Sequence, residues 1–351
     1  IGINLGKEDI NMLANRKIVI IGTGHVGSHC AYALAIQGIC DEIVLVDKDR
    51  TKAKSHSMDI ADSVSFFNSS VIVRCGDYSD CKDADIIVIS AGVPRLPGQT
   101  RLDVLDGSVE CVRDIVSNLN KIEIKGIIIT ITNPADIIAD FVRKATGLPK
   151  NRVFSTGTSL DTARMRRTVA DLCNIAPQSV IGFAMGEHGD SSMVPFSNLT
   201  IFGKNYKHLK EENPERFGKL SEKVITDQTH MRGMDIIEGK GSTEFGIGTA
   251  LADMAKAVLM DEHRILPAST LLEGEYGQTN VHAGVPCIIG RNGIEQVVEL
   301  KLTDEELKQF ENSCNVKNNI WLNNRKISKI CLLFASRVFL MNGITKQNIL
   351  R

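Results

Sequence analysis

The sequence lacks the features that mark several special classes of protein. Its nine cysteines form no CxxC pair, and none stands at metal-ligand spacing from a histidine, which argues against a structural zinc site and indicates reduced thiols. Lysine and arginine together number 41, and aspartate and glutamate 42. No excess positive charge is therefore present to hold a polyanion. We expect no metal ion, no nucleic-acid partner and no membrane partner.

Long apolar runs are also missing. Residues 1–17 contain none of signal-peptide length, and the apolar run 330–341 is interrupted by Arg337 and is shorter than the roughly 20 residues that span a bilayer. Together with the thiols, this predicts a cytoplasmic protein. The 351 residues exceed the roughly 250 to 300 at which a single core stops growing, so we expect two packed domains.

Short apolar runs alternate with helical segments between Lys17 and Asn133. The runs are continuous, as in strands buried on both faces of a parallel sheet. The expected strands are KIVIIG, EIVLVD, DIIVISAG and GIIITITN, and helices are expected at 26–37 and 52–63. The pattern predicts an α/β fold with a doubly wound parallel sheet.

The pattern changes after Asn133-Pro134. Longer helices are expected at 159–173, 222–237 and 249–260, with short strands near Val180, Leu266 and Pro286. We place the first domain at residues 15–155 and a second, catalytic domain at 156–315, and we set residues 316–351 apart as an atypical C-terminal tail.

A glycine-rich turn, Gly22-Thr23-Gly24-His25-Val26-Gly27, joins the first strand to the first helix. In a dinucleotide-binding turn the first glycine permits the tight turn, the second lets the backbone approach a pyrophosphate, and the third lets helix and strand pack closely. Asp47 ends the next strand, where its carboxylate can accept hydrogen bonds from ribose hydroxyls and would repel the extra phosphate of NADP. The sequence therefore predicts NAD as cofactor, bound by a Rossmann domain.

Two further segments carry groups suited to the reduction of a 2-oxo acid. His188 lies in GEHGD after the apolar run 180–185, and Asp161 and Arg164 are three residues apart, on one face of the expected helix. A ketone that accepts a hydride needs a proton donor, and its carboxylate needs a cation. An imidazole has its intrinsic pKa near neutrality, and a guanidinium can hold a carboxylate with two parallel hydrogen bonds.

The motifs NPADI, GTSLDTAR and GEHGDS, in this order after a dinucleotide turn, resemble those of the L-lactate and L-malate dehydrogenases. The resemblance covers roughly residues 17–314. It implies a Rossmann domain followed by an α+β C-terminal domain, an NAD-dependent enzyme that acts on a small 2-oxo or 2-hydroxy acid, and a homotetramer or homodimer.

The resemblance also implies roles for individual residues. His188 would be the general acid/base, with Asp161 holding its other ring nitrogen, and Arg164 would bind the substrate carboxylate. The proline- and glycine-containing loop 93–101 would close over the site and bring Arg101 to the ketone oxygen. Asn133 would contact both the substrate and the nicotinamide ribose.

The substrate is less clearly marked. Arg95 stands where the family usually has glutamine in lactate enzymes and arginine in malate enzymes, and it could pair with a second carboxylate. Glu187 and Thr243, a further candidate substrate contact, are lactate-like. The motifs taken together favour pyruvate and L-lactate. Oxaloacetate and L-malate remain an alternative because of Arg95. A branched 2-oxo acid is another alternative, because relatives that act on such substrates share the TARM motif.

The same residues argue against other classes of function. A non-catalytic NAD-binding protein would be expected to lack part of the proton-relay pair or the carboxylate clamp, and both are present. The related NAD-dependent glycosidases need a metal and a cysteine-centred site that this sequence does not supply. Arg166 matches the arginine through which fructose 1,6-bisphosphate activates some bacterial relatives, but Ile181 replaces the matching histidine, so we expect no such activation.

Overall fold

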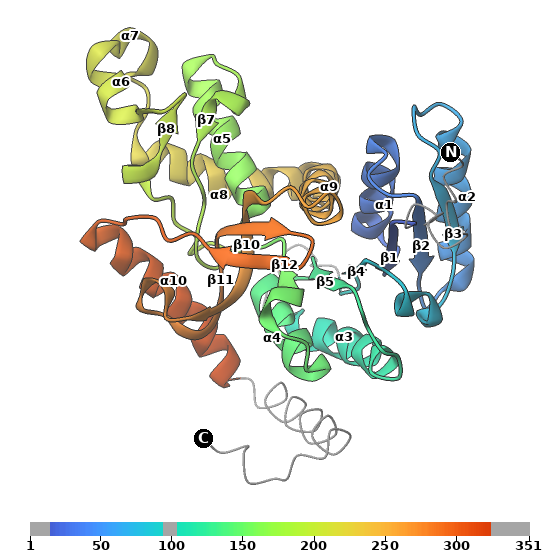
Figure 1. Cartoon of the computed structure of the whole chain (residues 1–351). Coiled ribbons are helices and arrows are strands. Elements are labelled where there is room, and N and C mark those ends of the chain that lie inside the picture. The colour runs from blue at the N-terminus through green and yellow to red at the C-terminus, as the bar shows by residue number, and fades with distance from the viewer. Residues whose placement is uncertain (1–14, 94–103, 324–351) are drawn as a thin grey trace, which may run out of the picture.

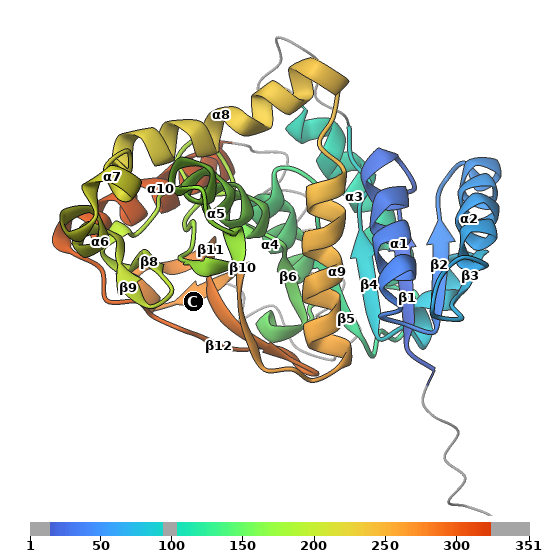
Figure 2. The same ribbon diagram turned by 90° about the horizontal axis from the view of Figure 1, so that it is seen from above.

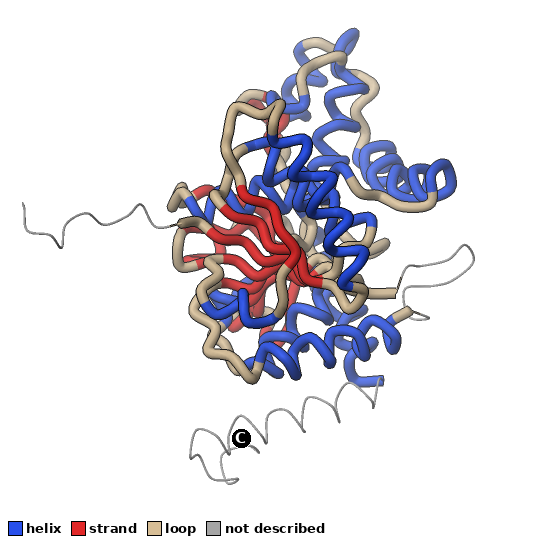
Figure 3. Tube along the Cα trace, turned by 90° about the vertical axis from the view of Figure 1, so that its right-hand side faces the viewer, coloured by secondary structure: helices blue, strands red, loops and turns tan. Residues whose placement is uncertain are grey.

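The computed structural model describes residues 15–93 and 104–323. Its centre is a twisted nine-stranded sheet with helices on both faces (Figures 1 and 3). The strands of this sheet are β1 (Lys17–Ile21), β2 (Glu42–Val46), β3 (Ile72–Cys75), β4 (Ile86–Ile89), β5 (Ile127–Thr130), β6 (Val153–Ser155), β10 (Arg264–Glu273), β11 (Thr279–Gly290) and β12 (Gly293–Val297). A small second sheet contains β7 (Val180–Ile181), β8 (Thr200–Ile201) and β9 (Lys204–Asn205).

Helices connect and cover these strands. Those of the described residues are α1 (His25–Gln37), α2 (Arg50–Val64), α3 (Leu105–Leu119), α4 (Ala135–Thr146), α5 (Ser159–Cys173), α6 (Tyr206–Glu212), α7 (Pro214–Phe217), α8 (Glu222–Lys240), α9 (Phe245–Leu259) and α10 (Asp304–Asn323). Within residues 15–93 and 104–323, no helix has both the length and the apolar composition needed to cross a membrane.

The first half of the sheet has the predicted doubly wound arrangement. Its strands pair in parallel in the order β3-β2-β1-β4-β5-β6. The strand order reverses between β1 and β4, and in open sheets of this kind ligands bind outside the carboxyl ends of the strands at that point. The turn that follows β1 begins with Gly22, so the fold places the glycine-rich segment at the expected ligand position.

The side chains of β1 show why continuous apolar runs form these strands. Ile18 and Ile20 join the core cluster that contains residues of α1 and α9. Val19 and Ile21 join the cluster on the other face, which contains residues of α3 and α4. All four are at most 2% exposed. Burial of each such side chain contributes roughly 1.5–3 kcal/mol to folding. The side chains on both faces of β1 therefore stabilise it in the interior of the sheet.

The sheet continues from the first half of the chain into the second. β10 pairs antiparallel with β6 through Ser269 and Ser155, and β11 and β12 extend the sheet beyond it. Helix α9 comes from the second half of the chain but packs beside α1 of the first half (Figures 1 and 2). The two halves are therefore joined by hydrogen-bonded strands as well as by helix packing.

Most predicted elements are present, with differences at their ends. Helix α5 has the predicted bounds, whereas α9 begins at Phe245, four residues before the predicted start. The short strand expected near Val180 is present as Val180–Ile181 (β7), and the rest of the apolar run 180–185 is not part of it. After β7 the chain turns toward α5, where the Ala184 amide donates to Thr162 Oγ1 at 2.9 Å.

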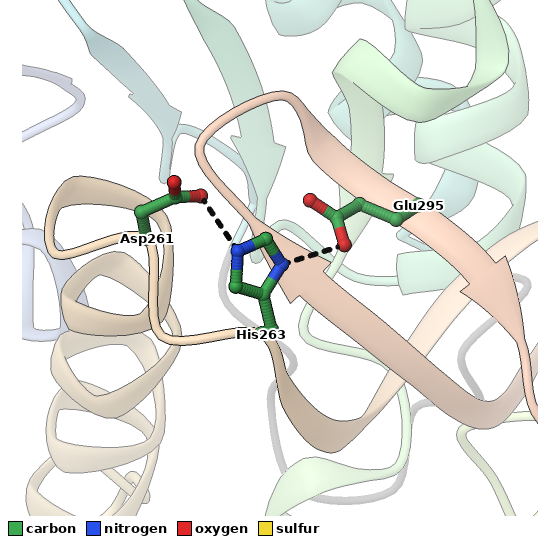
Figure 4. Close-up of side chains that lie close together, drawn as sticks. All are labelled: Asp261, His263 and Glu295. Carbon is green, nitrogen blue, oxygen red and sulfur yellow. Dashed lines mark hydrogen bonds and ion pairs between the residues drawn. The ribbon is translucent and has the colours of Figure 1, made fainter.

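A histidine between two acids joins the turn after α9 to β12 (Figure 4). His263 Nδ1 lies 2.8 Å from Glu295 Oε2, and His263 Nε2 lies 3.6 Å from Asp261 Oδ1. Among the described residues this is the one group of three side chains with metal-ligand atoms within 4.8 Å of one another. Each ring nitrogen faces a different carboxylate, so we interpret the group as an ion-paired cluster.

This cluster predicts a pH-dependent contribution to stability. The hydrogen bond to Glu295 raises the pKa of His263 above its ordinary value of 6.5. The stabilisation is therefore fully present below pH 6.5 and is lost as the pH rises through the raised pKa. We expect His263→Gln to lower the melting temperature at pH 6 and to have less effect at pH 8.5, as measured by differential scanning fluorimetry.

The control is His208→Gln, because His208 is exposed on α6. The interpretation fails if the difference between wild type and His263→Gln is the same at both pH values.

Candidate active site

The three glycines of the turn after β1 have three distinct environments. Gly22 has a φ of +98°, and a Cβ added there would lie 2.6 Å from the Ala91 backbone nitrogen. A Cβ at Gly27 would lie 1.9 Å from the Gly22 carbonyl oxygen, so helix and turn could not pack as they do. A Cβ at Gly24 would meet no atom of the described residues within 4 Å. Gly22 and Gly27 are thus needed by the fold, whereas Gly24 faces open space.

The start of α1 is suited to an anion. Gly24 is its N-cap residue, and no side chain caps the helix. The amides of a first helical turn have no partner within the helix, and the helix dipole makes this end positive. A phosphate can accept hydrogen bonds from these amides, and its negative charge is stabilised at this end of the helix. The open space at Gly24 and the uncapped helix end therefore fit the pyrophosphate of NAD.

Asp47 lies directly after β2, close to this turn. Its Oδ2 accepts hydrogen bonds from the Thr23 amide at 2.7 Å and the Thr23 hydroxyl at 3.0 Å, and its Oδ1 accepts from the Asp49 amide at 3.0 Å. Burial alone would raise the pKa of Asp47, but these hydrogen bonds outweigh it and lower the pKa below its ordinary value. Asp47 is therefore ionised at neutral pH and can accept further hydrogen bonds from hydroxyl groups.

The second group of candidate residues is centred on Asp161. Asp161 Oδ2 lies 2.6 Å from His188 Nδ1, and Asp161 Oδ1 lies 3.3 Å from Arg164 Nη1. The side chains of these three residues are between 11% and 16% exposed. A carboxylate only accepts hydrogen bonds, so Nδ1 of His188 carries a proton in this pair. Nε2 is then the ring nitrogen that does not face Asp161.

Helix packing places Arg164 beside this pair. Arg164 is one turn after Asp161 on α5, and a Cβ added at Gly233 of α8 would lie 3.0 Å from Arg164 Nη1. The missing side chain at Gly233 thus lets the guanidinium lie against α8. An imidazole, a carboxylate and a guanidinium meet here, and this set can protonate a carbonyl oxygen and bind a carboxylate.

The segment that carries His188 is not a regular strand. Met185 and Gly186 make isolated bridges to Met193 and Gly284. Beyond them the Glu187 amide donates to Ser313 Oγ at 2.8 Å, and the His188 amide donates to Asp136 Oδ2 at 2.9 Å. Side chains from α10 and α4 therefore hold the backbone on which His188 is carried.

Asn133 and Thr243 lie on segments next to these groups. Asn133 is exposed after β5, and α4 begins two residues later with Asp136 in its first turn. Thr243 is half-buried before α9, and a Cβ added at Gly246 would lie 2.7 Å from Leu160 Cδ1 at the start of α5. The predicted contacts Arg95 and Arg101 lie outside the described residues.

Sequence reasoning assigned no role to Asp136 or to Glu244. Glu244 is 8% exposed and contacts Lys240 at 2.6 Å and His29 Nδ1 of α1 at 3.0 Å. The hydrogen bond from Lys240 lowers the pKa of Glu244. Glu244 thus ties the Thr243 segment to the helix of the glycine-rich turn. The contact of Glu244 with His29 and that of Asp136 with the His188 amide have no signal in the sequence, because each joins residues far apart in the chain.

Arg166 has a partner within the chain. Its guanidinium donates to the Gly182 carbonyl oxygen at 3.2 and 3.3 Å, and burial lowers its pKa. Ile181, at the position where some relatives have a histidine, is half-exposed and apolar. These residues do not form a pair of cations for a bisphosphate.

Comparison with known families matches nearly the whole described chain. The model of the lactate/malate dehydrogenase NAD-binding domain matches residues 16–155, and that of the lactate/malate dehydrogenase alpha/beta C-terminal domain matches residues 158–322. Two similar curated proteins are L-lactate dehydrogenase 3 of Bacillus anthracis and L-lactate dehydrogenase of Fusobacterium nucleatum. The first is 43% identical over 86% of this chain and 95% of its own length, and the second is 43% identical over 87% and 96%.

Solved structures agree with this match. The minor L-lactate dehydrogenase of Enterococcus mundtii in its ligand-bound form is similar with a TM-score of 0.84 and 35% identity, over 89% of this chain and 99% of that one. MGS-M5, a lactate dehydrogenase from a Medee basin deep-sea metagenome library, gives a TM-score of 0.82 and 35% identity, over 88% and 98%.

The geometry at Gly24 predicts a variant that binds the cofactor poorly but folds normally. Gly24 has a φ of −70°, which any residue adopts, and an added Cβ meets nothing. A methyl group there would occupy the space into which the pyrophosphate fits. We expect Gly24→Ala to raise the Kd for NADH about tenfold or more, equivalent to ~1.4 kcal/mol, with an unchanged melting temperature. Fluorescence titration with NADH measures the Kd.

The matched control is Gly239→Ala on α8, where an added Cβ also meets no atom within 4 Å in the part of the chain that the structure describes. An unchanged NADH affinity in Gly24→Ala would contradict the assignment of this space to the pyrophosphate.

Proposed function

The chain belongs to the lactate/malate dehydrogenase family, and from this premise we propose that it is an L-lactate dehydrogenase, which reduces pyruvate with NADH and oxidises L-lactate with NAD. The observation that carries the proposal is the contact of Asp161 with both His188 and Arg164. Asp161 thus brings a proton donor, His188, next to a cation that can bind a carboxylate, Arg164. The family's NAD-binding domain supplies the cofactor site.

The roles of the residues follow from their chemistry. Bound NADH supplies a hydride to C2 of the substrate. Arg164 binds the substrate carboxylate through two parallel hydrogen bonds and so fixes the orientation of the ketone. His188 gives the proton on Nε2 to the ketone oxygen. Asp161 accepts the hydrogen bond from Nδ1 at 2.6 Å and stabilises the imidazolium that is present before this transfer.

The choice of pyruvate is supported by the names of the similar proteins and by Glu187. Glu187 accepts a hydrogen bond from Ser191, and its amide donates to Ser313. The lactate-like glutamate is therefore built into the loop that carries His188. Oxaloacetate is the second candidate, because Arg95 could pair with a second carboxylate.

We also propose a homo-oligomer that works in the cytoplasm. Apolar side chains of α1 and α2 are exposed, with Tyr32 at 41%, Ile36 at 48% and Met58 at 58%, and a second subunit would cover them. Burial raises the pKa of Cys40 and of Cys81 to about 12, so both are stable as thiols in a reducing compartment.

Comparison of three substrates tests the proposed function. Initial rates of NADH oxidation with pyruvate, oxaloacetate and 2-oxoisocaproate should give the highest kcat/KM for pyruvate. A higher value for oxaloacetate would identify a malate dehydrogenase, and in that case Arg95→Gln should lower the kcat/KM for oxaloacetate more than that for pyruvate. A lack of activity with all three would refute a 2-hydroxy acid dehydrogenase.

The carboxylate-binding role of Arg164 predicts a large effect of a conservative change. Lysine keeps the charge but offers no pair of parallel hydrogen bonds, and one hydrogen bond to a charged group contributes ~1.5–3 kcal/mol. Arg164→Lys should therefore raise the KM for pyruvate roughly 10- to 100-fold in steady-state assays. Arg167→Lys is the matched control, because Arg167 lies on the same helix, 57% exposed. Equal KM values for the two variants would refute this role.

A further inference from the structure

The backbone of the His188 loop is held by two side chains from distant parts of the chain. The Glu187 amide donates to Ser313 Oγ of α10, and the next amide, that of His188, donates to Asp136 Oδ2 of α4. The strand-like bridges end at Gly186. Among residues 15–93 and 104–323, no neighbouring strand therefore fixes the position of His188, and these two hydrogen bonds take the place of sheet pairing.

Asp136 has an unusual environment for a carboxylate. It is 3% exposed, and its Oδ1 is buried without a hydrogen-bond partner within the described part of the chain. Its position in the first turn of α4 is favourable, because the helix dipole is positive at that end. The hydrogen bond from the His188 amide is the contact that its other oxygen makes.

Asp140, one turn further along the same helix, is a buried carboxylate that does form ion pairs, and it serves as a comparison for Asp136. It is 2% exposed, and it contacts Lys144 at 2.9 Å, Arg143 at 3.3 Å and His282 at 3.6 Å. The ammonium of Lys144 and the guanidinium of Arg143 compensate its charge. Asp136 has no comparable ion pair among the described residues and instead contacts the backbone of the proposed acid/base.

We propose that Asp136 is a positioning residue for His188, an inference that rests on the proposed function. Asp161 fixes the imidazole ring through Nδ1, and Asp136 fixes the backbone from which the ring extends. The helix that carries Asp136 begins directly after the Asn133 turn. Asp136 therefore holds the proton donor at a set position relative to the residue expected to contact the substrate and the nicotinamide ribose.

A small displacement of His188 should affect the chemical step more than substrate binding. Proton transfer needs the donor within hydrogen-bond reach of the ketone oxygen, and a misplacement of about 1 Å can cost ~100-fold in rate. Arg164 lies on α5, and the Asp161 oxygen that it contacts belongs to the same helix. Loss of this bond should therefore lower kcat and leave the KM for pyruvate nearly unchanged.

The experiment compares Asp136→Ala, Asp136→Asn and, as the matched control, Asp140→Asn in the full chain. The asparagine side chain keeps an oxygen that can accept from the His188 amide, whereas alanine keeps none. We expect Asp136→Ala to lower kcat about 10- to 100-fold, with the KM for pyruvate within about twofold of wild type. Asp136→Asn and Asp140→Asn should stay within about threefold in kcat. Rates are normalised to NADH-binding sites, so that misfolded protein does not lower kcat.

Hydrogen–deuterium exchange of the protein without substrate gives a second readout. The peptide that covers residues 186–190 should exchange faster in Asp136→Ala and at the wild-type rate in Asp136→Asn and Asp140→Asn. Unchanged exchange and a kcat within twofold of wild type in Asp136→Ala would overturn the proposal. An equal loss of kcat in Asp136→Asn would also overturn it, because the hydrogen bond would then not be the cause.

These outcomes are distinct from a failure of the proposed function. If wild type reduced none of the 2-oxo acids, the lactate dehydrogenase assignment would fail. The exchange measurement would still decide whether Asp136 holds the loop. If Asp136→Ala did not fold, the proposal would be judged on Asp136→Asn, for which retained kcat and exchange support it and a loss in either refutes it.

Discussion

The site depends on one buried carboxylate that contacts two groups able to carry positive charge. Asp161 lies between His188 and Arg164 at 2.6 and 3.3 Å, respectively. In a region of low dielectric such contacts are strong, and an uncompensated charge there would be costly. The histidine and the arginine are therefore held in a fixed relation to each other, and the position of α5 determines where both of them lie.

The sheet gives this arrangement a rigid frame. β6 of the first half pairs with β10 of the second half, and α9 packs against α1. Glu244 adds a contact with His29 at 3.0 Å. The glycine-rich turn and the His188 loop thus belong to elements joined by strand pairing, helix packing and an ion pair.

The sequence allowed the parallel sheet, the glycine-rich turn and the Asp161–Arg164 spacing to be predicted, because each depends on residues close together in the chain. Strands such as β1 are buried on both faces and so have continuous apolar runs. The hydrogen bonds from Glu187 to Ser313 and from His188 to Asp136 join residues 126 and 52 positions apart, so no local pattern indicates them. The apolar run 180–185 does not continue as a strand beyond Ile181, because the Ala184 amide donates to Thr162 Oγ1 of α5 and Met185 joins the main core cluster.

The Ser313 contact also has a consequence for how the protein is made. The chain emerges from the ribosome with its N-terminus first, so Gly22, Asp161 and His188 are all available before α10 has been synthesised. The Glu187 amide can meet its acceptor only after residue 313 has left the exit tunnel, and the Gly186 bridge likewise waits for Gly284. A nascent chain can thus form the parallel strands of its first half early, but the His188 loop gains these two contacts only after β11 and α10 have been synthesised.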